Sequence, residues 1–143
     1  MYDFLLAPVL SFLLAQSIKF ALKARHKKLK AKDFFAYSSM PSSHTATVVS
    51  LAIMVLLKEG VSSPLFAIML VVSSVVITDA VGLRNYLGQH GKTLNVLVED
   101  LKEDELIEKN AYPKLLEQIG HRPIEILAGG LLGAAISIAI WLI

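Results

Sequence analysis

The chain has 143 residues, 55% of them hydrophobic, and a mean hydropathy of +0.60. This length fits a single domain, residues 1–143, and such an apolar composition excludes an ordinary water-soluble protein. The absence of cysteine excludes disulfides and thiolate chemistry, and a formal net charge of +2 is too small to indicate a partner by itself.

Four apolar segments predict four transmembrane helices, because a crossing needs about 20 mostly apolar residues, or about 17 at the short end. The expected spans are about 4–22, 42–57, 64–82 and 123–143. The second is marginal and reaches a full crossing only if its helix begins near Ser42. We expect the first to be a membrane anchor, because it lacks the basic region and cleavage site of a signal peptide. The sequence therefore predicts an all-α integral membrane four-helix bundle.

Basic residues gather between the first two spans, at Lys23, Arg25, Lys27, Lys28, Lys30 and Lys32. The loop after the second span carries only Lys58 and Glu59. The positive-inside rule then places residues 23–43 and 83–121 in the cytoplasm and both termini outside. Anionic lipids are a natural further contact for the basic loop, whereas a nucleic-acid partner is not expected without interleaved aromatics.

Residues 92–119 predict a cytoplasmic amphipathic helical segment. An apolar stripe at helical spacing is formed by Leu94, Leu97, Val98 and Leu101. Asn-Ala-Tyr-Pro at 110–113 should break this helix. A short second helix is then expected from Lys114 to Ile119, ending at Gly120.

The second span begins with the run Met40-Pro41-Ser42-Ser43-His44. The start of a helix leaves backbone N–H groups unpaired, and these attract anions. Ser42 or Ser43 can cap the helix or bind phosphate oxygens, and His44 can donate a proton. From this pentapeptide alone, the simpler interpretation is an N-cap followed by an interfacial histidine.

Each of the four spans carries polar side chains at its predicted cytoplasmic end. These residues are Gln16, Lys19, His44, Asp79, Arg84, His121 and Glu125. Charged groups in the apolar slab cost about 2.5–3.5 kcal/mol each on insertion scales, so they usually have partners or functions. Taken singly, Lys19 can extend to the headgroups and Asp79 can pair with Arg84. Convergence from four helices favours one site instead.

These residue types can perform phosphate chemistry. Lys19 and Arg84 can clamp a phosphate, and His44 and His121 can act as general acid and nucleophile. Glu125, four residues after His121, is expected on the same helical face, where it can accept the ring N–H and fix the tautomer. The sequence has no zinc-protease motif and no Cys/His cluster, so we expect neither a metal nor another cofactor.

Five ordered segments resemble the divergent, short bacterial and plastid branch of the type 2 phosphatidic acid phosphatase superfamily, which also includes the vanadium haloperoxidases. They are Gln16…Lys19, Met40-Pro-Ser-Ser-His44, Asp79-Ala-Val-Gly-Leu-Arg84, Leu94-Asn95 and Gly120-His-Arg-Pro-Ile-Glu125. The resemblance implies that His121 attacks phosphorus, that Glu125 orients it in place of the usual Asp, and that His44 protonates the leaving group. It also implies that Lys19 and Arg84 hold the phosphate, which Ser42 and Ser43 can contact. Supporting positions are Gln16, Asp79 and Asn95.

The chain departs from the superfamily pattern in three ways. Four helices are counted where the superfamily usually has six. The motif Lys-x6-Arg-Pro is absent, since Lys19 to Arg25 is one residue short and Lys114 to Arg122-Pro123 is one residue long. The third motif places an arginine six residues before its nucleophile, and Arg84 stands six residues before His90. His90 is therefore a rival nucleophile, although Leu94 stands where the orienting Asp would be.

The sequence thus predicts a metal-independent phosphatase of a lipid phosphate or pyrophosphate, working through a phosphohistidine. It would act at the cytoplasmic face of a bacterial plasma membrane on a phospholipid or polyprenyl phosphate. Two alternatives remain: a non-catalytic lipid-binding or lipid-flipping protein with the same basic pocket, and a structural assembly subunit. Gly129-x-x-x-Gly133 permits close helix packing, either within one subunit or at a homodimer seam.

Overall fold

The computed structural model describes residues 2–24, 39–108 and 112–143, which form five α-helices and no strand. The helices are α1 (Asp3–Ala24), α2 (Ser43–Glu59), α3 (Pro64–Val81), α4 (Leu83–Glu103) and α5 (Pro123–Trp141). The all-α class is confirmed, and the ends of α1, α2, α3 and α5 lie within two residues of the expected spans. Apart from Lys23, the predicted basic loop lies outside the described residues.

Three helices are long and apolar enough to cross a membrane. They are α1 with 22 residues, the almost continuous pair α3–α4 with 40, and α5 with 19. Helix α2 has 17 residues, so at about 1.5 Å per residue it is roughly 26 Å long, close to the hydrocarbon thickness of a bilayer. Large apolar side chains remain exposed on these helices, such as Leu5 (68%), Leu65 (53%) and Leu131 (65%). Their exposure fits a surface covered by lipid.

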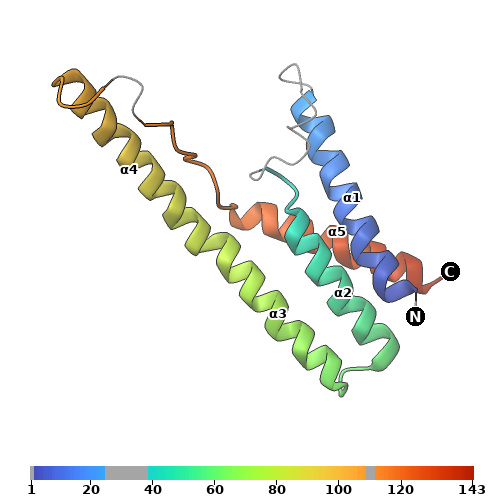
Figure 1. Cartoon of the computed structure of the whole chain (residues 1–143). Helices are drawn as coiled ribbons and strands as arrows, with labels where there is room; N and C mark the ends of the chain where they lie inside the picture. The colour runs from blue at the N-terminus through green and yellow to red at the C-terminus, as the bar shows by residue number, and fades with distance from the viewer. Residues whose placement is uncertain (1, 25–38, 109–111) are drawn as a thin grey trace.

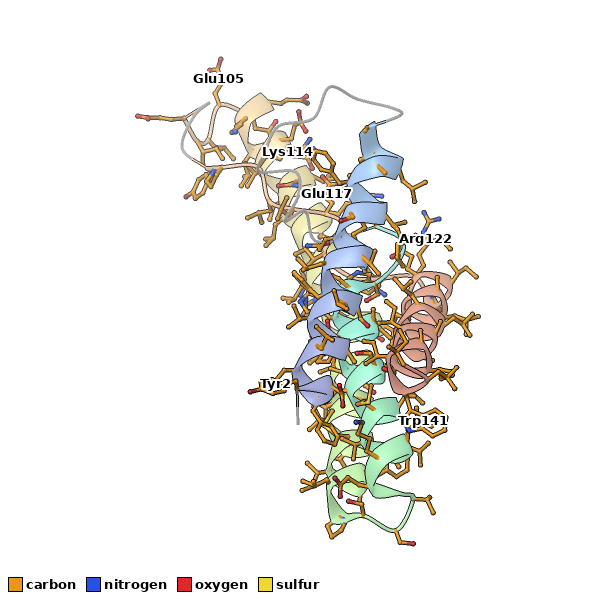
Figure 2. All side chains as sticks on the ribbon, turned by 90° about the vertical axis from the view of Figure 1, so that its right-hand side faces the viewer. Tyr2, Glu105, Lys114, Glu117, Arg122 and Trp141 are labelled. Carbon is orange, nitrogen blue, oxygen red and sulfur yellow. The ribbon has the colours of Figure 1, made fainter. Side chains whose placement is uncertain are left out.

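The two chain ends lie on the same side of the molecule (Figure 1). Tyr2 and Trp141 lie toward that end, whereas Glu105 and Lys114 lie at the opposite one (Figure 2). Tyr2 is 80% exposed and Trp141 is 48% exposed, as expected for aromatic residues at a membrane–water boundary.

Helix α2 is central and packs against α1, α3 and α5. Two glycines let α5 approach it closely. A Cβ on Gly129 would lie 2.3 Å from the carbonyl oxygen of Ser42, and one on Gly133 would lie 2.3 Å from that of Ala46. The Gly-x-x-x-Gly pair therefore packs within the subunit, as small residues do in membrane helix pairs.

Hydroxyl groups add interhelical hydrogen bonds around α2. Ser137 Oγ donates to the carbonyl oxygen of Ser50 at 2.6 Å, and Ser73 Oγ donates to that of Val48 at 3.4 Å. Because no water is available inside a bilayer, such side chains bond to backbone carbonyls of neighbouring helices. These bonds tie α5 and α3 to the central helix.

The predicted boundaries of the cytoplasmic segment are wrong at both ends. The connection after α3 is the single residue Gly82, whose N–H donates to the carbonyl oxygen of Thr78, so the chain continues from α3 into α4 with little change of direction (Figure 1). The helix ends at Glu103, and Glu105 has a φ of 58°, which no helix can accommodate.

The short helix predicted at 114–119 is also absent. Residues 112–122 form an extended segment, here called the strap. It lies against α4 where two glycines leave space: a Cβ on Gly88 or Gly91 would lie 2.5 or 2.6 Å from a carbonyl oxygen of the strap. Asn95 Oδ1 accepts from the N–H of Leu115 at 2.9 Å, and its Nδ2 donates to the Leu115 carbonyl at 3.0 Å. The strap bonds to α4 rather than to itself, which explains why it is not helical.

Gly133→Ala should destabilise the protein by about 1–3 kcal/mol, because its Cβ meets a backbone oxygen that cannot move without separating α5 from α2. Gly130→Ala is the matched control, since its Cβ would be 3.9 Å from its nearest neighbours and alanine favours a helix. Unfolding midpoints in detergent measure both. Equal midpoints would contradict the close α2–α5 contact.

Candidate active site

Ser42 forms the N-cap of α2. Its Oγ accepts from the N–H of Thr45 at 3.4 Å and from Thr45 Oγ1 at 2.9 Å, and the residue is fully buried. Its own N–H donates to the carbonyl oxygen of Glu125 at 2.9 Å, which joins the starts of α2 and α5. The structure therefore gives Ser42 one of its two predicted roles, the cap of α2, and the phosphate contact stays a prediction.

Lys19 and Ser43 meet between α1 and α2. Lys19 is only 4% exposed, and its Nζ donates to Ser43 Oγ at 3.2 Å. Gln16, one turn earlier on α1, is also buried, and its Oε1 has no partner within the described part of the chain. A lysine ammonium has three donors, so this buried cation can bind an anion as well as the hydroxyl.

The backbone of His121 is fixed on both sides. Its N–H donates to the carbonyl oxygen of Ala80 in α3 at 3.0 Å. Its carbonyl accepts from Asn85 Nδ2 at 3.3 Å, and the same amide nitrogen donates to the carbonyl oxygen of Val81 at 2.7 Å. The strap thus delivers His121 to the junction of α3 and α4.

The imidazole of His121 is buried, with the residue 1% exposed, and neither ring nitrogen has a partner among residues 2–24, 39–108 and 112–143. The predicted bond from Glu125 is not made. Glu125 Oε2 instead accepts from the N–H of Arg122 at 3.1 Å in the capping box of α5. Because α5 begins at Pro123, His121 precedes the helix and the expected four-residue helical spacing does not apply.

Burial lowers the pKa of the His121 imidazole below its ordinary value. The positive charge of Lys19 lowers this pKa further, Glu125 opposes the shift, and His44 and Arg84 contribute smaller lowering effects. Two consequences follow. The lowered pKa favours the neutral ring, which is its nucleophilic form, and charges on α1, α2, α4 and α5 act on it.

Asp79 and Arg84 pair at the α3–α4 junction, with Arg84 Nε 2.5 Å from Asp79 Oδ2. The pair is about one-third exposed, so its contribution to stability is small. The guanidinium keeps its Nη donors for an anion. His44, exposed in the first turn of α2, lies within electrostatic range of this pair and of Lys19.

The structure does not bring His90 and Asn95 to this cluster. His90 is exposed on α4, six residues beyond Arg84, or about 9 Å along the helix axis. Asn95 lies farther along and holds the strap through Leu115 and through Glu117 Oε1 at 2.9 Å. It supports the segment that carries His121 and lies too far along α4 for a direct contact with phosphate.

The motifs do not identify Asn85 or the two glycines that receive the strap. Their signal is a spacing: Asn85, Gly88, Gly91 and Asn95 are three, three and four residues apart and share one face of α4. Glycines allow another backbone to approach closely, and amide side chains can bond to its N–H and carbonyl groups. A helix face that carries both therefore indicates that a backbone segment packs against that face.

A cavity of about 370 Å³ lies beside the strap, next to His121. Its lining residues are Ser39, Met40, Asn85, Glu117, Gln118, Gly120, Arg122 and Glu125. Arg122 and Glu117 are labelled in Figure 2, at the start of α5 and on the strap. The lining is rich in hydrogen-bonding groups. In the described ranges, no group of three or more His, Cys, Asp or Glu is placed to hold a metal ion.

Comparison with known proteins agrees with the motifs. The family model described as Divergent PAP2 family matches residues 2–136. The uncharacterized membrane protein YuiD of Bacillus subtilis (strain 168) is 32% identical over 145 residues, which cover 95% of this chain and 92% of that protein. No solved structure matches the chain significantly. With nearly its whole length matched, and with the resemblance of its motifs confirmed, this membrane protein belongs to the Divergent PAP2 family.

Proposed function

We propose that the protein is a metal-independent phosphatase of a lipid phosphomonoester or pyrophosphate, with His121 as nucleophile. One observation carries the proposal: a buried imidazole without a described hydrogen-bond partner lies in the electrostatic field of Lys19 and Arg84. A buried polar group without a partner is costly, by about 1–3 kcal/mol, and such groups are often found at sites of ligand or water binding.

The reaction follows from these groups. A ring nitrogen of neutral His121 attacks phosphorus while the bond from phosphorus to the leaving oxygen breaks, and His44 gives that oxygen a proton. His44 then takes a proton from water, whose oxygen attacks the phosphohistidine and releases phosphate. The cations Lys19 and Arg84 stabilise the negative charge of the five-coordinate transition state, which is the main demand of phosphoryl transfer.

A lipid substrate is supported by the surroundings of the cluster. Exposed apolar side chains flank it on α1 and just before α2: Ile18, Leu22 and Met40. A lipid can therefore present its phosphate to Lys19 and Arg84 while its chains stay in the bilayer. The cytoplasmic orientation rests on the basic segment that follows α1 in the sequence.

A second candidate is a lipid-binding or lipid-flipping protein that uses the same pocket without chemistry. It is favoured by the position of Glu125, which caps α5 and does not orient the His121 ring. Both candidates need the cations, but only the phosphatase needs the imidazole as a nucleophile.

His121→Ala should abolish phosphate release from a panel of lipid phosphates and pyrophosphates assayed in detergent with EDTA. His44→Ala should lower turnover by about 10²–10⁴-fold, because it removes proton transfer. His90→Ala is the matched control, an exposed histidine on α4 that should leave turnover within a few-fold. A wild type that binds the lipids but releases no phosphate would support the second candidate. An active His121→Ala with an inactive His90→Ala would make His90 the nucleophile.

The His121 imidazole should titrate below the ordinary histidine value of about 6.5. Lys19→Met should move this pKa upward, because it removes a positive charge that disfavours the imidazolium. Nitrogen-15 NMR of histidine-labelled protein in micelles measures both titrations, with His121→Gln used to assign the signal. An unperturbed wild-type pKa, or no shift in Lys19→Met, would contradict the described environment of the ring.

A further inference from the structure

Helix α4 carries an exposed stripe that the phosphatase proposal does not use. Successive members of the stripe are four and three residues apart in turn. They are Leu83, Leu87, His90, Leu94, Leu97 and Leu101. Four of the leucines, at 83, 87, 94 and 97, are between 47% and 66% exposed. An alternation of four and three is the a/d pattern of a coiled coil, with 87, 94 and 101 as a positions and 83, 90 and 97 as d positions. These six residues are called the leucine seam below.

The leucine seam and the strap occupy different faces of α4. The strap contacts Gly88, Gly91 and Asn95. Because each residue turns the helix by about 100°, these three positions lie about a third of a turn around the helix axis from the centre of the seam. Among the described helices, α4 packs appreciably only against α3, from which it continues. The seam is thus left without a partner in the described part of the subunit.

The length of α3–α4 argues against lipid as the cover of the seam. The pair spans 40 residues, or about 60 Å, which is twice the hydrocarbon thickness of roughly 30 Å. Helix α3 alone is long enough to cross, and α4 continues from it away from α1, α2 and α5 (Figure 1), so we expect α4 to extend beyond the apolar slab.

The composition of α4 argues the same way. A helix that lies on a membrane surface carries an excess of Lys and Arg on its polar face, opposite Trp, Phe or Leu. Helix α4 has no such excess, because its charges balance: Arg84, Lys92 and Lys102 against Glu99, Asp100 and Glu103. A narrow a/d stripe is typical of a helix that pairs with another helix.

We propose that the leucine seam pairs with the seam of a second copy of this chain as a parallel two-stranded coiled coil. Two copies inserted in one membrane have the same orientation, so their α4 helices emerge parallel and in register. The flanking positions permit this pairing. Tyr86 and Thr93 stand at g positions, and Gly91, which the strap contacts, and Val98 stand at e positions, so no like charges meet along the central part of the seam.

His90 occupies a d position near the middle of the seam, where it would meet its counterpart in the second copy. A polar residue at one core position of a coiled coil specifies register at a cost in stability. This placement gives an exposed histidine outside the active-site cluster a role in pairing. The strap lies along one edge of the paired surface, and His121 is not part of that surface.

Cysteine cross-linking tests the pairing directly, because the chain has no cysteine of its own. Leu94→Cys and Leu97→Cys, reconstituted in liposomes, should convert mostly to disulfide-linked dimers under mild oxidation. Val96→Cys is the matched control: Val96 is 54% exposed at the same height on α4 but lies off the seam, and its variant should stay monomeric. Disulfides need Cα atoms within about 7 Å, so only paired seams bring the thiols close enough.

Other outcomes would overturn the proposal. Equal cross-linking at 94, 96 and 97 would indicate random collision. The absence of cross-linking at 94 and 97, with these two thiols shielded from a maleimide reagent in liposomes and the thiol at 96 reactive, would identify lipid as the cover. Free labelling at all three positions without cross-linking would leave the seam unpaired.

Substitutions in the seam provide an independent measurement. Leu94→Asp should shift the full-length protein in detergent from dimer toward monomer, because it places like charges opposite each other in the seam. His90→Leu should keep the dimer together at greater dilution, because it removes the one polar core residue. Unchanged molar masses in light scattering for both variants would also overturn the proposal.

Discussion

The close approach of α5 to α2 is the contact on which the site depends. With only hydrogen at Gly129 and Gly133, the two helices meet at backbone distance, and the N–H of Ser42 reaches the carbonyl oxygen of Glu125. This brings the start of α2, with His44, to the same level as the start of α5, preceded by His121. A larger residue at either glycine would separate the two helix starts and leave the cluster incomplete.

The second constraint is the position of the strap, which has no hydrophobic core of its own. It is held by amides of α4 and by the backbone of α3, so His121 is fixed through its own N–H and carbonyl while its ring makes no described hydrogen bond. In the proposed function, a side chain held in this way is positioned in advance for an incoming phosphate. A phosphate bound by Lys19 and His121, as we propose, would offset the cost of burying the Lys19 charge and an imidazole without a described partner.

The transmembrane helices were predictable because a bilayer demands long apolar segments, and α1, α3 and α5 show that pattern without interruption. Convergence on one end was predictable from the placement of Lys19, His44, Arg84 and His121 at successive helix ends. The strap was not, because its conformation is determined by Asn85, Asn95 and two glycines on another element. The predicted Glu125–His121 contact fails for a local reason: Pro123 begins α5 with Arg122 as its N-cap, and the Glu125 side chain closes the capping box.

The central claim is that the His121 imidazole becomes covalently phosphorylated. The direct measurement is a rapid-quench reaction with lipid substrate labelled in the terminal phosphate, followed by mapping of the labelled peptide by mass spectrometry. The account predicts an acid-labile, alkali-stable phosphoenzyme on His121 in wild type and His44→Ala, and none in His121→Ala. Phosphate release by the wild type with no labelled protein at any quench time, or with the label on His90, would contradict it.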